Sequence, residues 1–350
     1  MGEVREDDDP AAAWAALWGH AERYRSLGLG RVADELAASG PLTFGSGREP
    51  VILDTDIGGD PDDAVAVAVA ARTVPGLALV ITADEFHGDG RARFARRFLD
   101  ALGRPEVPVV AGRDLGNTRY FCVEGLTASS AATSFSRDAL TAVLDICDRT
   151  DGKVRWVGMG PMSTLAELLT ADPALAGRLE ITQMGGAVNY RKPEVAEHNI
   201  RLDPAAARRV MDLAVPRSVS LVLSDVTFRP DTEMAVRASS PLYQGLAATR
   251  QPWAQILVAH LDRWYSDFYE ETLMHDPLTL SAALLLPFVD FTSERVRFAE
   301  DGRMRLDDTG QQVFLSTRVE YQAFARWLHR GLGMNVDTDI TTGKPGSRPA

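Results

Sequence analysis

The chain has 350 residues, 45% of them hydrophobic, and a formal net charge of −12 at pH 7. This length and apolar content suit one large domain with additions at its periphery. Nucleic-acid binding relies on clustered Lys and Arg side chains, so the acidic balance argues against a nucleic-acid partner. A metal ion or a small neutral molecule fits this charge better.

The sequence lacks the features of a secreted or membrane protein. No stretch reaches the roughly 18 consecutive apolar residues of a membrane span, and an acidic run stands where a signal peptide would begin with basic residues. We therefore expect a cytoplasmic protein with no membrane partner. Cys122 and Cys147 are isolated in the sequence, and we interpret them as buried small residues.

Three segments are predicted along the chain. Residues 1–49 form an N-terminal extension and linker, with apolar residues at helical spacings from Pro10 to Ser39 and a Gly, Ser and Pro-rich stretch after them. Residues 50–334 form the main domain. Residues 335–350 are polar and form a loose tail.

The main domain alternates short β-branched runs with amphipathic segments of helical length. This pattern predicts an α/β fold, with a Rossmann-like, open, mostly parallel sheet and flanking helices. Ligands bind such sheets beyond the carboxyl ends of the strands. Strands are expected at 51–53, 78–82, 107–110, 154–157, 179–183 and 219–223, and helices are expected to start near Asp62, Arg91, Arg137, Ser163, Asp203 and Trp253.

The last part of the domain has a different pattern. Two short β-type runs, Arg295 to Phe298 and Arg303 to Leu306, flank Asp301-Gly302 and predict a C-terminal hairpin. A strand near Val313 and a helix from Glu320 to Leu332 are expected after it. We interpret this region as an appendage on the same domain.

An acidic stretch comes directly after the first predicted strand. Five aspartates lie between positions 54 and 63, and such crowding is costly without a cation. Hard divalent cations such as Ca²⁺ take oxygen ligands. Asp60-Pro61 also has the pattern of a helix N-cap, but that pattern does not account for Asp54 and Asp56 at the end of the strand. The stretch therefore predicts a metal site.

The same stretch has a second interpretation. In haloacid-dehalogenase-type phosphatases, an Asp-x-Asp after the first strand supplies a nucleophile, which here would be Asp54 of a Mg²⁺-dependent phosphatase. That type normally has a hydroxylic or β-branched residue where Gly58 stands. The phosphatase is therefore the weaker alternative.

Five motifs in order, from Val51 to Leu280, resemble those of the inosine–uridine-preferring nucleoside hydrolase family. The first is the aspartate stretch, which is similar to the family's Asp-x-Asp-Pro-Gly-x-Asp-Asp. The other four are Gly160-Pro161-Met162-Ser163, Met184-Gly185-Gly186-Ala187, Glu197-His198-Asn199 with Asp203-Pro204, and Met274-His275-Asp276-Pro277. The resemblance implies hydrolysis of the N-glycosidic bond of a ribonucleoside-like substrate to free base and ribose, by a homodimer or homotetramer.

The resemblance also implies roles for individual residues. Asp56, Asp63 and Asp276 would ligate Ca²⁺, helped by the backbone carbonyl of Ser163. Asp56 would in addition be the general base for the attacking water, and His275 would help protonate the departing base. Four further residues would contact the ribose and favour an oxocarbenium-like transition state. They are Asp62, Met184, Glu197 and Asn199.

Three departures from the family pattern concern the substrate. Glu85 stands near the position where the family has an asparagine that contacts ribose, and His198 replaces a phenylalanine near the leaving group. Asn189 is the nearest candidate for a displaced asparagine. We keep all three as predicted substrate contacts. The departures also leave open a family member that binds a nucleoside-like ligand without turnover.

Some of these residues have structural interpretations as well. Asp203-Pro204 has the pattern of a helix N-cap and first helical residue, and we expect Asp203 to cap. Asp276-Pro277 has the same pattern, but capping is not expected to be the sole role of Asp276. Four aromatic residues near positions 264–269 are candidates for contacts with the nucleobase, although helical aromatics usually lie in a core. They are Trp264, Tyr265, Phe268 and Tyr269.

Overall fold

The computed structural model describes residues 49–117, 120–127, 134–216 and 218–334. The chain divides into two units, residues 1–49 and 50–350, and the sheet, its helices and the cavity all belong to the second. The predicted helical extension, nearly all of its linker and the predicted tail lie outside the described residues.

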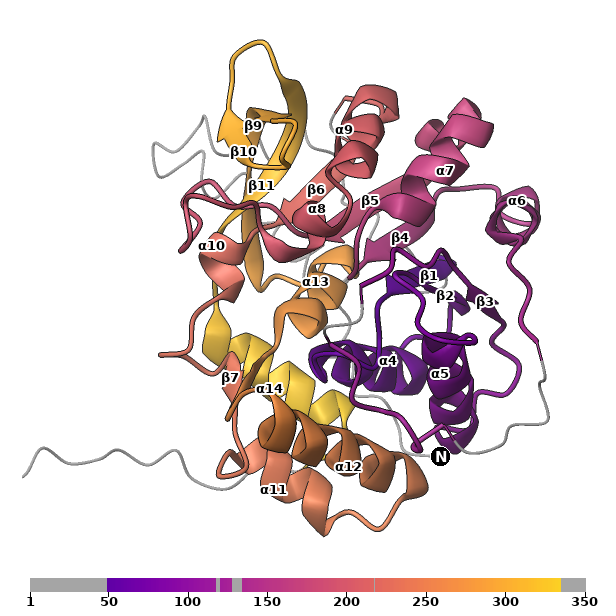
Figure 1. Cartoon of the computed structure of the whole chain (residues 1–350), viewed down its shortest axis with the longest axis vertical. Helices are drawn as coiled ribbons and strands as arrows, with labels where there is room; N and C mark the ends of the chain where they lie inside the picture. Colours follow the sequence, from indigo (N-terminus) through magenta and orange to yellow (C-terminus); the bar gives the residue numbers. More distant parts are fainter. Residues whose placement is uncertain (1–48, 118–119, 128–133, 217, 335–350) are drawn as a thin grey trace, which may run out of the picture. The chain divides into compact units, whose positions relative to one another are not determined.

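A nine-stranded sheet forms the centre of the second unit (Figure 1). Its strands are β1 (Val51–Thr55), β2 (Leu77–Thr82), β3 (Val109–Ala111), β4 (Val154–Gly158), β5 (Leu179–Met184), β6 (Val219–Val222), β9 (Val289–Phe298), β10 (Met304–Leu306) and β11 (Gln311–Val319). Their order is β10-β9-β11-β6-β5-β4-β1-β2-β3, and only the pairs made by β9 are antiparallel. The predicted open, mostly parallel sheet is confirmed.

Helices cover both faces of this sheet. Successive side chains of a strand point to opposite faces, so Val51 and Leu53 of β1 join one hydrophobic core while Ile52 joins the other. The first core includes residues of α4 (Asp62–Thr73), α5 (Gly90–Ala101), α11 (Pro241–Ala248), α12 (Pro252–Asp267), α13 (His275–Ala283) and α14 (Tyr321–Gly331). The second includes residues of α6 (Ala139–Asp148), α7 (Ser163–Ala171) and α9 (Pro204–Leu213).

Helix α4 lies in the interior of the first core. It consists almost entirely of Ala and Val after its first two residues, and it is buried from Asp62 to Ala71. A helix that is apolar on all sides is a buried helix, and α4 packs against α5, α12, α13 and α14. Its N-terminus is thereby fixed beside that of α13.

The strand order creates a crevice at β1. From β1 the chain adds β2 and β3 on one side, and then returns to place β4, β5 and β6 on the other. The loops after β1 and β4 therefore diverge at the carboxyl ends of two adjacent strands, which is where ligands bind in open α/β sheets.

The predicted elements agree with the structure, except for the placement of the C-terminal hairpin and for several elements that were not expected. All predicted helix starts fall within two residues of the observed ones, but the C-terminal hairpin is not an appendage. Strands β9 and β10 do form a hairpin, yet β9 pairs with β11 and β11 pairs in parallel with β6, so all three extend the central sheet. Helix α11 and five shorter elements were not expected, namely α8 (His198–Leu202), α10 (Ser224–Thr227), β7 (Ala235–Val236), β8 (Thr272–Leu273) and the 3₁₀ helix Pro173–Gly177.

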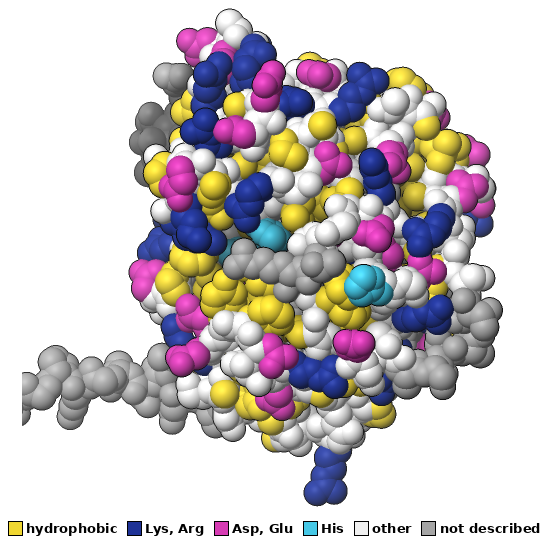
Figure 2. All heavy atoms as spheres, viewed as in Figure 1, with side chains coloured by type: hydrophobic (Ala, Val, Ile, Leu, Met, Phe, Trp, Pro, Cys, Tyr) yellow, Lys and Arg dark blue, Asp and Glu magenta, His cyan; other side chains and the backbone are white. Residues whose placement is uncertain are grey.

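The surface carries both signs of charge. On the face shown in Figure 2, Lys and Arg side chains are interspersed with Asp and Glu. Within the described residues, no helix is both long enough and apolar enough to cross a bilayer.

Candidate active site

A cavity of about 380 Å³ lies at the carboxyl ends of the central strands. Nine of the twelve residues predicted as catalytic, metal-binding or substrate-binding line it. They are Asp56, Asp62, Asp63, Met184, Glu197, His198, Asn199, His275 and Asp276. The structure thus brings together segments that are more than 200 residues apart in the chain.

The carboxylates at the cavity floor come from two helix N-termini. Asp62 and Asp63 begin α4, and Asp276 is the second residue of α13. One carboxylate oxygen from each of the three lies within 4.8 Å of the others, and each side chain is only 3% exposed. Asp56, which comes directly after β1, is half-buried and lines the same cavity.

Keeping these buried carboxylates ionised costs free energy. Burial raises the pKa of Asp63 well above its usual range, and the charges of Asp56 and Asp62 raise it further. Burial also raises the pKa of Asp276, with further contributions from the charges of Asp62 and Asp63. The helix N-termini offset part of this cost. Buried oxygens converging in this way fit a hard divalent cation, which would compensate their charge.

Hydrogen bonds fix the carboxylates in place. The Thr55 hydroxyl donates to Oδ1 of Asp63, and the backbone N–H of Asp276 donates to Oδ2 of Asp62 at 3.2 Å. The predicted Asp60-Pro61 cap is displaced by one residue, because Pro61 occupies the N-cap position and makes no side-chain bond. Asp60 instead lines the cavity and accepts a bond from the Thr272 hydroxyl.

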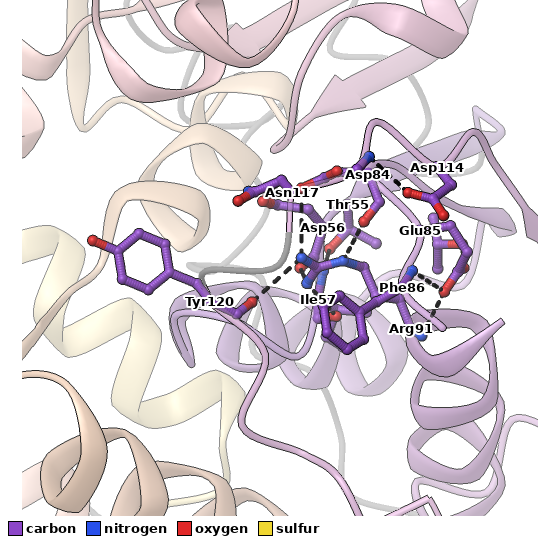
Figure 3. A network of polar contacts seen from close by, with 12 residues as sticks. Thr55, Asp56, Ile57, Asp84, Glu85, Phe86, Arg91, Asp114, Asn117 and Tyr120 are labelled. Carbon is purple, nitrogen blue, oxygen red and sulfur yellow. Dashed lines mark hydrogen bonds and ion pairs between the residues drawn. The ribbon is translucent and has the colours of Figure 1, made fainter. Parts of the chain in front are cut away.

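A single buried arginine supports the loop that carries Asp56 (Figure 3). Arg91 is 1% exposed, and its Nε donates to the carbonyl of Asp84 at 2.6 Å. One terminal nitrogen donates to the carbonyls of Asp56 and Ile57, and the other donates to that of Tyr120 at 3.4 Å. The same guanidinium pairs with the Asp84 carboxylate at 3.7 Å. Arg91 therefore ties together the loops after β1 and β2 and the segment at Tyr120.

Glu85 does not line the cavity, which corrects its predicted role as a ribose contact. Its carboxylate accepts the N–H groups of Arg91 at 2.7 Å and Ala92 at 3.2 Å, in the first turn of α5. It also accepts the Thr82 hydroxyl at 2.5 Å. Asp89, at the N-cap position, makes no side-chain cap bond. Glu85 is therefore engaged in capping α5.

Two further predicted residues lie outside the cavity lining. Asn189 is exposed, and its backbone N–H donates to Asp225 at 2.8 Å, so its predicted substrate contact is not supported. Ser163 begins α7, and its hydroxyl donates to Asp203 at 2.7 Å. Asp203 caps α9 through the N–H of Ala206, as expected. The metal contact through the Ser163 carbonyl stays a prediction.

Glu197 and Asn199 line the same cavity, and hydrogen bonds to the backbone hold their side chains. Glu197 caps α8 by accepting the N–H of Asn199 at 3.2 Å, and it also accepts the N–H of Gly186 at 3.1 Å. The Asn199 amide donates to the carbonyls of Met159 at 2.9 Å and Met184 at 3.2 Å. These bonds leave the amide oxygen of Asn199 to accept a bond from a ligand hydroxyl.

His275 begins α13, directly before Asp276, and also lines the cavity. Its Nδ1 is 2.6 Å from the Thr227 hydroxyl. Burial lowers the pKa of His275 to about 3, and the charges of Arg191 and His198 lower it further, so the ring is neutral at pH 7. When the hydroxyl donates to Nδ1, the ring proton lies on Nε2, which then is a hydrogen-bond donor.

Aromatic side chains line another part of the cavity. Tyr120 lies next to Trp264 and Tyr269, with ring centroids 5.7 and 6.5 Å away, and the two tyrosine hydroxyls are 3.1 Å apart. All three line the cavity. Of the other aromatic candidates, Phe268 packs behind Tyr120 and Tyr265 donates to a backbone carbonyl away from the cavity. Two of the four predicted aromatics therefore border it.

The family profile described as inosine–uridine preferring nucleoside hydrolase matches residues 51–337. The chain belongs to this family. Its members hydrolyse the N-glycosidic bond of nucleosides. The nucleoside hydrolase described here is 31% identical over 265 residues to the pyrimidine-specific ribonucleoside hydrolase RihA of Shewanella woodyi, which covers 70% of this chain and 82% of that protein.

Solved structures show the same fold. A plant nucleoside hydrolase, PpNRh1, superposes with a TM-score of 0.66 and 21% identity over 81% of this chain and 99% of that one. A purine-preferring ribonucleoside hydrolase from Gardnerella vaginalis superposes with a TM-score of 0.64 and 21% identity, and the match covers 81% of this chain and 98% of that one. These relatives differ in base preference, so family membership does not fix the base that this nucleoside hydrolase accepts.

The phosphatase interpretation is wrong for this nucleoside hydrolase. Asp54 is 1% exposed and does not line the cavity, so it cannot reach a phosphate ester there. Burial and the charge of Asp56 raise the pKa of Asp54 well above its usual range, which disfavours the anionic nucleophile. Among the described residues, neither of its carboxylate oxygens has a hydrogen-bond partner.

Sequence reasoning missed several residues of the site. Helix α5 contains four arginines, and their spacing in the sequence does not indicate that Arg91 is the buried one. Tyr120 lies in a segment without regular structure, where no periodicity is available. Its cavity position depends on contacts with α12, more than 140 residues later, and only a fold-level match could have located it.

A buried histidine links the aspartate loop to α12. His260 is fully buried, its Nε2 lies 2.9 Å from the carbonyl of Gly59, and its Nδ1 has no partner among the described residues. Protonating Nδ1 would therefore bury an unsatisfied N–H. Consistent with this, burial lowers the pKa of His260 from 6.5 to about 4.

This histidine predicts acid sensitivity of the fold. The unfolded chain takes up the proton as pH falls through 6.5, whereas the folded chain takes it up only near pH 4. Stability from neutral His260 is thus fully present above pH 6.5, and up to about 3 kcal/mol is lost as pH falls towards 4. Chemical denaturation between pH 7 and 4.5 should show a smaller loss for His260→Gln than for wild type. Equal losses would exclude His260 as a source of acid sensitivity.

Proposed function

We propose that this nucleoside hydrolase depends on Ca²⁺, held by Asp56, Asp63 and Asp276 and by the backbone carbonyl of Ser163. The observation that supports it is the buried convergence of carboxylate oxygens at the two helix N-termini. Asp62 lies in the same cluster, but its Oδ2 already accepts the N–H of Asp276. We therefore assign its other oxygen to a ribose hydroxyl.

The carboxylate of Asp56 takes the proton of the attacking water in this proposal. Asp56 lines the cavity, and Arg91 holds its carbonyl from behind, so the position of its side chain is set by the loop. A bound Ca²⁺ would hold the ribose diol and lower the pKa of the water. A positioned general base contributes roughly 10²- to 10⁴-fold to the rate.

In this proposal Glu197 and Asn199 hold the sugar. Asn199 offers its amide oxygen to a ribose hydroxyl, and Glu197 places a negative charge near the ring, fixed by backbone N–H groups. Positive charge develops at the anomeric carbon as the glycosidic bond lengthens. A preorganised carboxylate stabilises this charge more strongly in the transition state than in the ground state.

In this proposal a hydrogen-bond donor and aromatic rings border the departing base. His275, neutral and with its ring oriented by Thr227, offers Nε2–H to the base as negative charge develops on it. Trp264, Tyr120 and Tyr269 offer ring surface for stacking. His198 borders the same region and completes the proposed leaving-group environment.

Two variants test the assignment of the aspartates. Asp56→Asn should lower kcat for base release by roughly 10³-fold, because the general base is removed. Asp62→Asn should raise KM and keep Ca²⁺ affinity within a few-fold of wild type, because Asp62 is assigned to the ribose. Steady-state kinetics and calcium titration measure both quantities, with Asp290→Asn on the surface as control. Wild-type kcat in Asp56→Asn would contradict the proposed base.

A further inference from the structure

Three basic side chains line the cavity of this acidic protein. They are Arg191, Lys192 and Arg201, and all are exposed. The chain has a net charge of −12, and the cavity floor is made of carboxylates. A neutral nucleoside has no charge for these residues to bind. Their presence in the cavity lining therefore calls for an anionic ligand.

In the described part of the chain, none of these three cations lies within 4.0 Å of a carboxylate oxygen. The Arg191 guanidinium stacks on the rings of Phe228, at 3.9 Å, and Tyr190, at 4.8 Å. Stacking uses the faces of the guanidinium and leaves its N–H edge to bind an anion.

Arg201 is also held in place. It donates to the carbonyl of Ala196 at 2.7 Å, and its other terminal nitrogen lies 3.3 Å from Nδ1 of His198. Arg201 lies in α8, which contains Asn199 and is capped by Glu197. Its positive charge therefore lies near the residues assigned to the sugar.

In the proposed function the 2′- and 3′-hydroxyls of the ribose bind at the aspartates, which leaves C5′ free to carry a further substituent. The three basic side chains belong to the lining of the same cavity. The ring of Phe228, on which Arg191 stacks, lies 6.5 Å from the ring of His275, so this cation borders the interior of the cavity. A substituent on C5′ would meet the guanidinium groups.

We propose that the substrate carries a phosphate on its 5′-carbon, bound by Arg191 and Arg201 with Lys192. This inference rests on the proposed function and defines its substrate class as nucleoside 5′-phosphates. Guanidinium groups match phosphate oxygens with paired, charge-assisted hydrogen bonds. The reaction breaks the C1′–N bond, joins a water oxygen to C1′ and transfers a proton to the base. Its products are free base and ribose 5-phosphate.

The test compares matched substrates. Base release is measured from uridine and inosine, from their 5′-monophosphates and from their 5′-diphosphates, with wild type, Arg191→Gln, Arg201→Gln and the double variant. Arg250→Gln is the control, because Arg250 is exposed and lies outside the cavity lining. Wild type should favour a 5′-phosphate over its nucleoside by at least about tenfold in kcat/KM.

The variants should lower this preference at least about tenfold, mainly through KM, while Arg250→Gln preserves it. Ribose 5-phosphate should likewise inhibit wild type more strongly than ribose, and Arg191→Gln should reduce that difference. Preference for either the monophosphate or the diphosphate supports the inference. Equal kcat/KM for nucleosides and nucleotides, or an unchanged preference in the double variant, would overturn it and leave the proposed function intact. Absence of base release from every substrate would overturn both.

Discussion

Asp63→Asn should abolish detectable Ca²⁺ binding and lower base release by about 10³-fold or more. Asp63 is 3% exposed, receives the Thr55 hydroxyl and shares the cavity floor with Asp276. The substitution keeps the size of the side chain and removes its charge. A cation held by three carboxylates would then lose one of its anionic ligands in a buried site, where water cannot replace it efficiently.

The same substitution should have the opposite effect on the metal-free protein. Burial raises the pKa of Asp63, and the charges of Asp56 and Asp62 raise it further, so removing this carboxyl relieves both the desolvation cost and the repulsion. Thermal unfolding in chelator should therefore show Asp63→Asn to be at least as stable as wild type. In excess Ca²⁺ only wild type should gain stability, because a ligand stabilises the state that binds it.

Calorimetric titration with Ca²⁺ measures the loss of binding directly. Asp290→Asn, an exposed substitution outside the cavity, serves as the matched control and should bind as wild type does. Calcium affinity of Asp63→Asn within threefold of wild type would remove Asp63 from the proposed ligand set.

Arg91→Met should destabilise the fold by about 3–5 kcal/mol, a typical cost of breaking a buried charged network. The guanidinium bonds to carbonyls of four residues and faces the carboxylate of Asp84, which is fully buried. Methionine is of similar length and lacks donors. The variant would leave Asp84 with an uncompensated charge and free the loop that carries Asp56.

Arg93→Met in the same helix is the matched control. Arg93 is less buried and donates to the carbonyl of Gly88, so its loss should cost less than about 1 kcal/mol. Urea denaturation measures both variants. Arg91→Lys should recover only part of the stability, because one ammonium cannot reach all the carbonyls that the guanidinium spans. A loss below about 1 kcal/mol for Arg91→Met would show that the network does not stabilise the fold.

The features predicted correctly from the sequence are those with local or motif signals. Buried parallel strands are continuous apolar runs, so β1 and β4 were identified near their observed bounds. The aspartates at the start of α4, and the pair Glu197 and Asn199, line the cavity, and the roles that the family resemblance implies for them stay predictions. In both cases the informative residues are close together in the chain.

The features that were missed depend on contacts between distant segments. Glu85 comes after β2 at the position expected for a ribose contact, but the first turn of α5 comes back to its carboxylate. The C-terminal hairpin has the local signal of an appendage, and only the pairing of β11 with β6 makes it part of the sheet. Arg191 and Arg201 line the cavity only because the segment between β5 and α9 borders it.

Metal-dependent release of a nucleobase at the aspartate cluster can be measured directly. Free base is separated by chromatography after incubation with a panel of purine and pyrimidine nucleosides and their 5′-phosphates, with Ca²⁺, with chelator, and with Asp63→Asn. We expect wild type to release base with Ca²⁺, to lose this activity in chelator and to regain it when Ca²⁺ is restored, while Asp63→Asn stays inactive throughout. Undiminished release in chelator or by Asp63→Asn would contradict a metal-dependent hydrolase at this cluster.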